Sequence, residues 1–415
     1  MSIIGRTGRP WEDIERDLGA MKGRDFSWSD GRMFLFYYYL DDALMQVQQK
    51  AYTAYWYENN QTHKAFPSLG IMEGDVIRAG VELASGGPEA WGTFTSGGSE
   101  SIFLAMTAAR NRGRSERGID RPNVVLPRTA HPTFDRACHY LGIEVRRVPT
   151  RGADYRVDLE GMRARMDADT VAVVGSAPNY PFGVFDQIEE IAAMAAAQGV
   201  WMHVDACVGG FLAPWVRRLG HDIPPYDFAV EGVMSMSADI HKYGLAAKGA
   251  SLLLVRDKAL MRHHLFEFED WERGPYASYT TQGTRPAGAV AAAWSVLSYL
   301  GEEGYLRAAR IIMDTKEKLV SGLNAIPGLR VLDHHQLSII VYTSDAPDLD
   351  MTLLADRLTE MGWFVGRQAE PRGVHIALNP SHAMSVGPYL HDVAAAVDQV
   401  RGATAGTSDR VALSY

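Results

Sequence analysis

The chain has 415 residues, of which 47% are hydrophobic, and a formal net charge of −9 at pH 7. This length is enough to bury the cores of one large and one smaller domain. The acidic balance argues against a nucleic-acid-binding protein, which would normally be basic. The only two cysteines, Cys138 and Cys207, exclude a disulfide framework and a cysteine-rich zinc site.

The first residues lack the apolar stretch of a signal peptide, and no run reaches the ~18 apolar residues of a spanning helix. We therefore expect a cytoplasmic protein without a membrane-spanning segment. Residues 1–62 are rich in aromatic side chains, from Phe34 to Tyr57. We interpret them as an N-terminal helical arm that packs on the body or on a second subunit.

Between residues 63 and 300, apolar runs alternate with amphipathic stretches. The pattern predicts strands at 123–127, 170–175, 200–205 and 250–255, and helices at 133–141 and 186–198. Gly142 and Gly199 follow these two helices, where glycine commonly ends a helix. The alternation predicts an α/β domain with a mostly parallel sheet that helices cover on both faces.

After residue 300 the pattern changes to a smaller α+β domain, which we place at 301–415. A long helix at 305–323 precedes short strands at 329–332, 337–342 and 374–378, and helices at 350–361 and 389–400. Residues 402–415 are small and polar, so we expect a loose tail or lid there.

A glycine-rich turn, Gly97-Gly98-Ser99, lies between an apparent strand and a helix. Backbone N–H groups at a helix start favour a phosphate, and glycine allows it to approach closely. Taken alone, a tight turn with a helix cap is the more common explanation. The turn matches neither the dinucleotide fingerprint nor the Walker motif.

Asp205 ends an otherwise apolar strand. A carboxylate there is costly unless it has a partner. A pyridinium N–H would be such a partner, and an ion pair with an arginine is an equal alternative. A zinc site made of His203, Asp205 and Cys207 would be unusual.

Lys242 follows the run Ser237-Ala238-Asp239-Ile240-His241, shortly before the apolar strand at 250–255. A lysine that forms a Schiff base and an aspartate that keeps a ring nitrogen protonated are the parts needed for pyridoxal 5′-phosphate (PLP). Burial and the neighbouring Lys248 would lower the pKa of Lys242 and favour this chemistry. Alone, Lys248 is equally explained as an exposed turn lysine.

His131 follows the strand at 123–127 and could stack on a cofactor ring, although a surface loop histidine is the simpler explanation in isolation. The order along the chain favours the cofactor: phosphate turn, stacking histidine, aspartate and then lysine, each where a strand meets a helix. Ligands of such sheets bind at the carboxyl ends of the strands.

Several stretches together resemble the sphingosine-1-phosphate lyases. They are Thr95–Ser101, Gly175–Pro178, His203–Leu212, Ser237–Gly244, and Tyr276–Ser278 with Gly283–Pro286. This family belongs to the group II PLP-dependent decarboxylase superfamily of fold type I. The resemblance implies an aspartate aminotransferase-like large domain with a seven-stranded sheet, and a homodimer with shared active sites.

The resemblance also implies roles for individual residues. Lys242, Asp205, His131 and His241 would be catalytic. The cofactor would be held by Gly98, Ser99, His131, Asp205, Cys207, His241 and Lys242, with Thr284 reaching its phosphate from the partner subunit. The substrate would be held by Tyr39, Asn60, His63 and Lys248. The sequence departs from the family pattern in Asn60-Gln61-Thr62-His63 and in Ala246-Ala247-Lys248-Gly249.

The implied reaction is retro-aldol cleavage of a phosphorylated sphingoid base to a fatty aldehyde and phosphoethanolamine, without a metal. Lys242, His241 or a tyrosine would transfer the protons. A decarboxylase acting on aspartate, glutamate or tyrosine is the alternative enzyme, since only the substrate pocket would differ. A PLP-binding protein without catalysis is a third alternative, and the presence of both Asp205 and Lys242 disfavours it.

Overall fold

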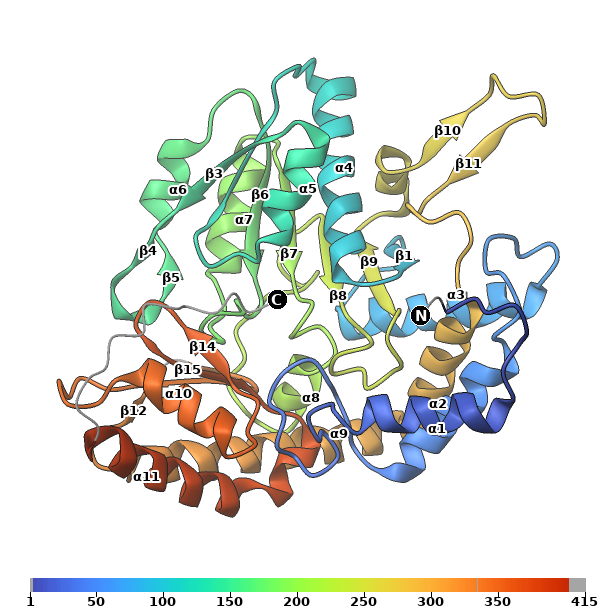
Figure 1. Ribbon diagram of the computed structural model, residues 1–415. Coiled ribbons are helices and arrows are strands. Elements are labelled where there is room, and N and C mark those ends of the chain that lie inside the picture. Colours follow the sequence, from blue (N-terminus) through green and yellow to red (C-terminus); the bar gives the residue numbers. More distant parts are fainter. Residues whose placement is uncertain (1–2, 334, 403–415) are drawn as a thin grey trace.

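The computed structural model describes residues 3–333 and 335–402 (Figure 1). The α-helices are α1 (Trp11–Lys22), α2 (Asp42–Ala54), α3 (Pro67–Leu83), α4 (Gly98–Arg117), α5 (Thr133–Leu141), α6 (Leu159–Arg165), α7 (Ile188–Ala197), α8 (Ala213–Arg218), α9 (Ala287–Asn324), α10 (Met351–Glu360) and α11 (Val386–Gly402). Short 3-10 helices are η1 (Gly152–Asp154), η2 (Lys258–His263) and η3 (Pro380–Met384).

The strands form one large sheet, one smaller sheet and two short hairpins. They are β1 (Trp91–Thr95), β2 (Asn123–Pro127), β3 (Glu144–Val148), β4 (Thr150–Arg151), β5 (Arg156–Val157), β6 (Thr170–Ser176), β7 (Trp201–Asp205), β8 (Ser235–Ala238), β9 (Ser251–Val255), β10 (Phe266–Phe268), β11 (Tyr276–Ser278), β12 (Arg330–Val331), β13 (Ile339–Thr343), β14 (Gly366–Gln368) and β15 (Gly373–Ala377).

The large sheet has seven strands in the order β1-β9-β8-β7-β6-β2-β3. Its neighbours pair in parallel except at β9, which is antiparallel to both β1 and β8. The predicted mostly parallel sheet is therefore confirmed. The carboxyl ends of β2, β6, β7 and β8 meet at one edge, so residues that follow these strands can share a site.

Helices cover both faces of this sheet, as the apolar runs require. Val124 and Leu126 of β2 belong to a buried cluster with α4 and α5. Val125, whose side chain points to the opposite face, belongs to the larger cluster that includes α7. Strands buried on both sides read as continuous apolar runs, and this is why they were recognisable in the sequence.

The smaller sheet, β12-β13-β15-β14, is antiparallel throughout and has α10 and α11 packed nearby (Figure 1). The long helix α9 connects the two sheets along the sequence. Gly301, with φ of 52°, interrupts the helical backbone of α9. This interruption lies next to residue 300, where the domain boundary stays a prediction.

The N-terminal region contains helices α1 and α2, but the aromatic run from Phe34 to Tyr39 lies between them and is not helical. Phe34 N–H donates to the carbonyl of Phe364 at 2.9 Å, so this run is joined to the segment before β14. Helix α2 packs on α9. The proposed tail at 402–415 lies almost wholly outside the described residues.

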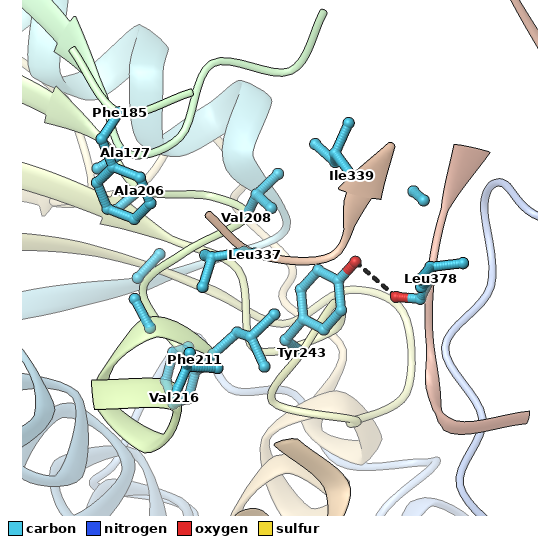
Figure 2. Packing of buried hydrophobic residues seen from close by; sticks show 14 of the residues in the cluster. Ala177, Phe185, Ala206, Val208, Phe211, Val216, Tyr243, Leu337, Ile339 and Leu378 are labelled. Carbon is cyan, nitrogen blue, oxygen red and sulfur yellow. Dashed lines mark hydrogen bonds between the residues drawn. The ribbon is translucent and has the colours of Figure 1, made fainter. Parts of the chain in front are cut away.

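Figure 2 shows how the loop after β8 is anchored. Tyr243 is buried against Leu337 and Ile339, and its hydroxyl donates to the carbonyl of Leu378 at 2.8 Å. Ile339 belongs to β13, and Leu378 follows β15. Because Lys242 precedes Tyr243, the position of the lysine depends on packing against the smaller sheet as well as on the large one.

None of the described helices is both long and apolar enough to cross a bilayer. Within the same residues, no cluster of three or more histidine, cysteine or acidic side chains has the geometry to bind a metal ion.

Candidate active site

A cavity of about 470 Å³ opens at the carboxyl ends of the central strands. It brings together eight of the expected site residues from four separate stretches of sequence. They are Gly98, Ser99, His131, Asp205, Cys207, His241, Lys242 and Lys248.

The glycine-rich turn forms the start of α4. Its cap residue, Gly97, offers no side-chain hydrogen bond, so the first N–H groups of this 20-residue helix face the cavity uncapped by a side chain. A Cβ at position 98 would lie 2.6 Å from Cys207 Sγ and 2.9 Å from Asp239 Oδ1. Glycine is thus required there by close packing, and the exposed backbone favours an anion.

Glu100 stabilises this turn from behind. Its Oε2 accepts hydrogen bonds from Ser96 N–H at 2.7 Å and the Ser96 hydroxyl at 2.8 Å. Its Oε1 accepts from Thr281 N–H at 2.8 Å and the Thr281 hydroxyl at 2.5 Å. Burial raises the pKa of Glu100, but these bonds outweigh it and hold the pKa below its usual value.

Asp205 ends β7 and is 9% exposed. Its Oδ1 accepts from Cys207 N–H at 3.1 Å and from the Ser237 hydroxyl at 3.2 Å. Neither bond involves Oδ2, so this oxygen can still accept a hydrogen bond from a group in the cavity. No arginine of the described chain forms an ion pair with Asp205, so the alternative of an arginine partner is wrong.

His131 lies across the cavity, in the loop after β2. Thr133 N–H donates to His131 Nδ1 at 3.2 Å, which leaves the ring proton on Nε2 when the imidazole is neutral. Burial lowers the pKa of His131 and outweighs the opposing charge of Asp205. His131 is therefore a flat, uncharged surface at neutral pH.

Lys242 is held by an aspartate that the sequence argument did not assign. Its Nζ lies 2.9 Å from Asp239 Oδ2, and Asp239 is 2% exposed. Burial alone would lower the pKa of Lys242, but the Asp239 charge outweighs it and raises the pKa well above its ordinary value. The expectation of a lowered pKa was wrong because it counted Lys248 and overlooked the nearer carboxylate.

His241 and Lys248 complete the charged wall of the cavity. Ala250 N–H donates to His241 Nδ1 at 3.3 Å, and burial lowers the pKa of His241 to about 4. Lys248 Nζ donates to the carbonyl of His241 at 3.1 Å and lies 4.8 Å from the centre of the Tyr38 ring. Although Lys248 is exposed at the mouth, partial desolvation and the Lys242 charge lower its pKa to about 8.

Four expected residues do not line this cavity. Tyr39 donates to Asp42 Oδ1 at 2.6 Å and packs against Trp28. Asn60 is buried and donates to Glu73 Oε2 at 2.5 Å, while His63 Nε2 lies 3.2 Å from Asn60 Oδ1. Thr284 is exposed on the segment after β11.

His63 instead lines a second cavity of about 410 Å³, beside the β10–β11 hairpin that projects from the body in Figure 1. Arg285, which borders this cavity, is already bonded to Glu73 Oε1 at 3.0 Å and to the carbonyls of Asn60 and Phe94. Among the described residues that line this second cavity there is no lysine and no aspartate, and PLP chemistry needs both.

The chain is similar to known proteins over most of its length. Residues 71–343 match the pyridoxal-dependent decarboxylase conserved domain. Sphingosine-1-phosphate lyase from Oryza sativa subsp. japonica is 34% identical over 94% of this chain and 73% of its own length. The enzyme of that name from Drosophila melanogaster is 37% identical over 87% of this chain and 66% of its own length.

The chain belongs to the sphingosine-1-phosphate lyase family. A solved sphingosine-1-phosphate lyase from Burkholderia pseudomallei superposes with a TM-score of 0.92 at 35% identity, over 97% of this chain and 94% of the other. A glutamate decarboxylase from Lactobacillus brevis has a TM-score of 0.85 at 19% identity, which shows the shared fold. The expected PLP fold type I is thus confirmed.

The cofactor of this lyase family is PLP, and the cavity fits it. The start of α4 offers N–H groups to a phosphate, Asp205 Oδ2 can accept from a ring nitrogen, and Lys242 supplies an amine. Asp239 Oδ1, buried and without a hydrogen-bond partner in the described chain, marks a polar position that the protein alone leaves unsatisfied.

Sequence reasoning missed two residues of this lyase-family site, Asp239 and Tyr38. Asp239 stands three residues before Lys242, and in the turn after β8 this spacing brings the two side chains together. Tyr38 belongs to the aromatic run, and the Lys248 ammonium makes a cation–π contact with the Tyr38 ring at the cavity. The i, i+3 spacing was a usable signal for Asp239, whereas a run of three consecutive tyrosines gave none for Tyr38.

Proposed function

We propose that the protein cleaves a phosphorylated long-chain amino alcohol, of the sphingosine 1-phosphate type, to a fatty aldehyde and phosphoethanolamine. The observation that carries this proposal is the second lysine of the cavity. Lys248 lies at the mouth, beyond the groups that would hold the cofactor, and has no carboxylate within ion-pair distance in the described chain. A cation in that position suits a substrate that carries its own phosphate.

When bound, PLP supplies an electron sink for the bond that breaks. Asp205 would keep the ring nitrogen protonated, because Oδ2 is free to accept its hydrogen. His131 would cover one face of the ring and exclude water from it. The Gly98 and Ser99 N–H groups and His241 would hold the cofactor phosphate, and Cys207 would lie near the other face.

The cavity offers distinct groups for the proton transfers. Burial raises the pKa of Tyr38 to about 12, so this residue keeps its proton and can act as a donor. Lys242 becomes a base only after it loses its own proton. His241, with a pKa of about 4, is neutral, and because its Nδ1 accepts from Ala250 N–H, its Nε2 carries a hydrogen that it can donate.

We further propose a homodimer in which Tyr39, His63 and Thr284 of one subunit act at the cavity of the other, while the buried Asn60 positions His63. What supports this is their position: within one chain the exposed His63 and Thr284 and the half-buried Tyr39 lie outside the cavity. A closed two-fold dimer would place each set against the partner's site.

Mixing two inactive variants tests this arrangement. Lys242→Ala and His63→Ala chains, unfolded and refolded together, should recover about a quarter of wild-type activity, because half of the dimers then carry one intact site. Each variant refolded alone is the control. No recovery, with mixed dimers demonstrated by mass, would refute shared sites.

Product analysis tests the reaction. Incubation with a panel of phosphorylated amino alcohols and amino acids should give aldehyde and phosphoethanolamine from the former and no carbon dioxide from the latter. Carbon dioxide from aspartate, glutamate or tyrosine would establish the decarboxylase alternative instead. A PLP-bound protein that converts neither class would establish cofactor binding without catalysis.

A further inference from the structure

Asp239 has a position that the cofactor chemistry described above does not use. It lies at the end of β8, is 2% exposed, and makes its ion pair with Lys242 through Oδ2 alone. Its Oδ1 has no hydrogen-bond partner within the described residues. A buried carboxylate with one unsatisfied oxygen is costly, so the Lys242 ammonium is its principal compensation.

Few other cations near Asp239 can compensate its buried negative charge. His241 Nε2 lies 3.7 Å from Asp239 Oδ2, but burial keeps this imidazole neutral near pH 7. Lys248 is the next cation, and its Nζ is engaged with the carbonyl of His241. Asp239 therefore depends on Lys242 more than on any other group that faces it.

Several ionisable groups face the Lys242 amine, and Asp239 has the largest effect on its charge. Besides Asp239, the Cys207 thiol and the Tyr38 hydroxyl face it, while Lys248 opposes its charge. Burial raises the pKa values of both Cys207 and Tyr38, so these two stay uncharged near neutral pH and contribute little. Among the residues that the structure describes, Asp239 is the one anion in direct contact with Lys242.

Covalent attachment of PLP requires that the Lys242 amine be neutral. A neutral Nζ attacks the aldehyde carbon, a carbon–nitrogen double bond forms, and the aldehyde oxygen leaves as water with the two amine hydrogens. An ammonium has no lone pair for this attack, so one proton must first leave Lys242 for solvent in the open cavity.

We propose that Asp239 is a positioning residue that holds Lys242 as an ammonium in the cofactor-free protein and thereby sets the pH at which the lysine captures PLP. This inference rests on the cofactor and is independent of the substrate. The 2.9 Å contact also fixes the place from which the lysine nitrogen would approach the ring.

The experiment is the pH dependence of PLP capture by cofactor-free protein, followed by the rise of visible absorbance. The wild-type rate should increase with pH through the alkaline range, because the raised pKa keeps Lys242 protonated below it. Asp239→Asn should move this profile to lower pH by about one unit or more, so that capture near neutral pH becomes about tenfold faster or more.

Asp227→Asn is the matched control. Asp227 is equally buried, at 1% exposed, but pairs with Arg217 and does not line the cavity. Its profile should coincide with that of the wild type. An Asp239→Asn profile that also coincides with the wild type would overturn the proposal, and it would do so without affecting the assignment of Lys242, which Lys242→Ala tests separately.

A measurement on the unaltered protein covers the case in which Asp239→Asn does not fold. Reductive methylation with formaldehyde modifies only neutral amines, and mass spectrometry locates the products. In the cofactor-free wild type, Lys248, whose pKa is about 8, should be methylated at lower pH than Lys242. Methylation of Lys242 first, or of both at the same pH, would refute the proposal.

Discussion

The cavity at the strand ends and the surface around His63 differ in how complete they are. In the cavity, residues from four distant stretches converge, and Asp205 Oδ2 and the start of α4 remain available to a ligand. Around His63, Asn60, Glu73 and Arg285 bond to one another. The first region is built to receive a cofactor within one chain, whereas the second is a stable surface that we expect to act across a subunit boundary.

The largest effect is expected from replacing Lys242, because the cavity at the strand ends would then lose the amine that binds the cofactor. Lys242→Ala should abolish the visible cofactor absorbance and reduce activity by at least about 10³-fold, since the covalent attachment is lost. Absorbance spectra and single-turnover assays measure both effects. Absorbance equal to that of the wild type would contradict the assignment of Lys242.

Asp205→Asn tests whether the cavity tunes the cofactor ring. The amide cannot carry the negative charge that favours a protonated ring nitrogen, so the rate should fall by about 10²- to 10³-fold while the cofactor remains attached. Spectra of the loaded variant verify attachment. Full activity with a protonated ring would show that another group supplies the charge.

Lys248→Ala separates the substrate phosphate from the cofactor phosphate. Loss of one charge-assisted hydrogen bond, worth ~1.5–3 kcal/mol, should raise the KM for a phosphorylated substrate by about 10- to 100-fold. The visible absorbance should not change. Lys258→Ala, at an exposed lysine paired with Glu89, is the control. If cofactor and activity disappear together, Lys248 holds the cofactor instead.

The smallest expected effect is on stability. Tyr243→Phe removes the hydroxyl that donates to the buried carbonyl of Leu378, so the free energy of unfolding should fall by about 1–3 kcal/mol. Urea denaturation measures the change, and Tyr57→Phe, at a tyrosine 85% exposed, is the control. Equal stabilities would mean that water replaces the lost donor.

The sequence predicted the parts of the fold that follow from local pattern. Helix α5 has the expected bounds, and β7 begins one residue later than predicted, because apolar runs and the glycine after α5 are local signals. The antiparallel direction of β9 was not predictable, since an apolar strand looks the same in either direction.

The parts of the candidate site that follow strand ends were also predictable from the sequence. The glycine turn, Asp205 and Lys242 each have a chemical reason to occur where a strand ends. The raised pKa of Lys242 had no counterpart in composition, because it depends on a 2.9 Å contact whose effect exceeds that of burial. Whether the pKa of a buried group is raised or lowered depends on distances that exist only in the folded chain.

The two oxygens of Glu100 have a mechanical consequence. One holds the turn at Ser96, the other holds Thr281, and Thr284 stands three residues further along the same segment. The Glu100 side chain therefore connects the segment after the β10–β11 hairpin to the turn at the start of α4, so a displacement of that segment would also move the turn. A neighbour that grips the hairpin would tighten or loosen the phosphate turn, and slower amide exchange at Ser96 and Thr281 together would report it.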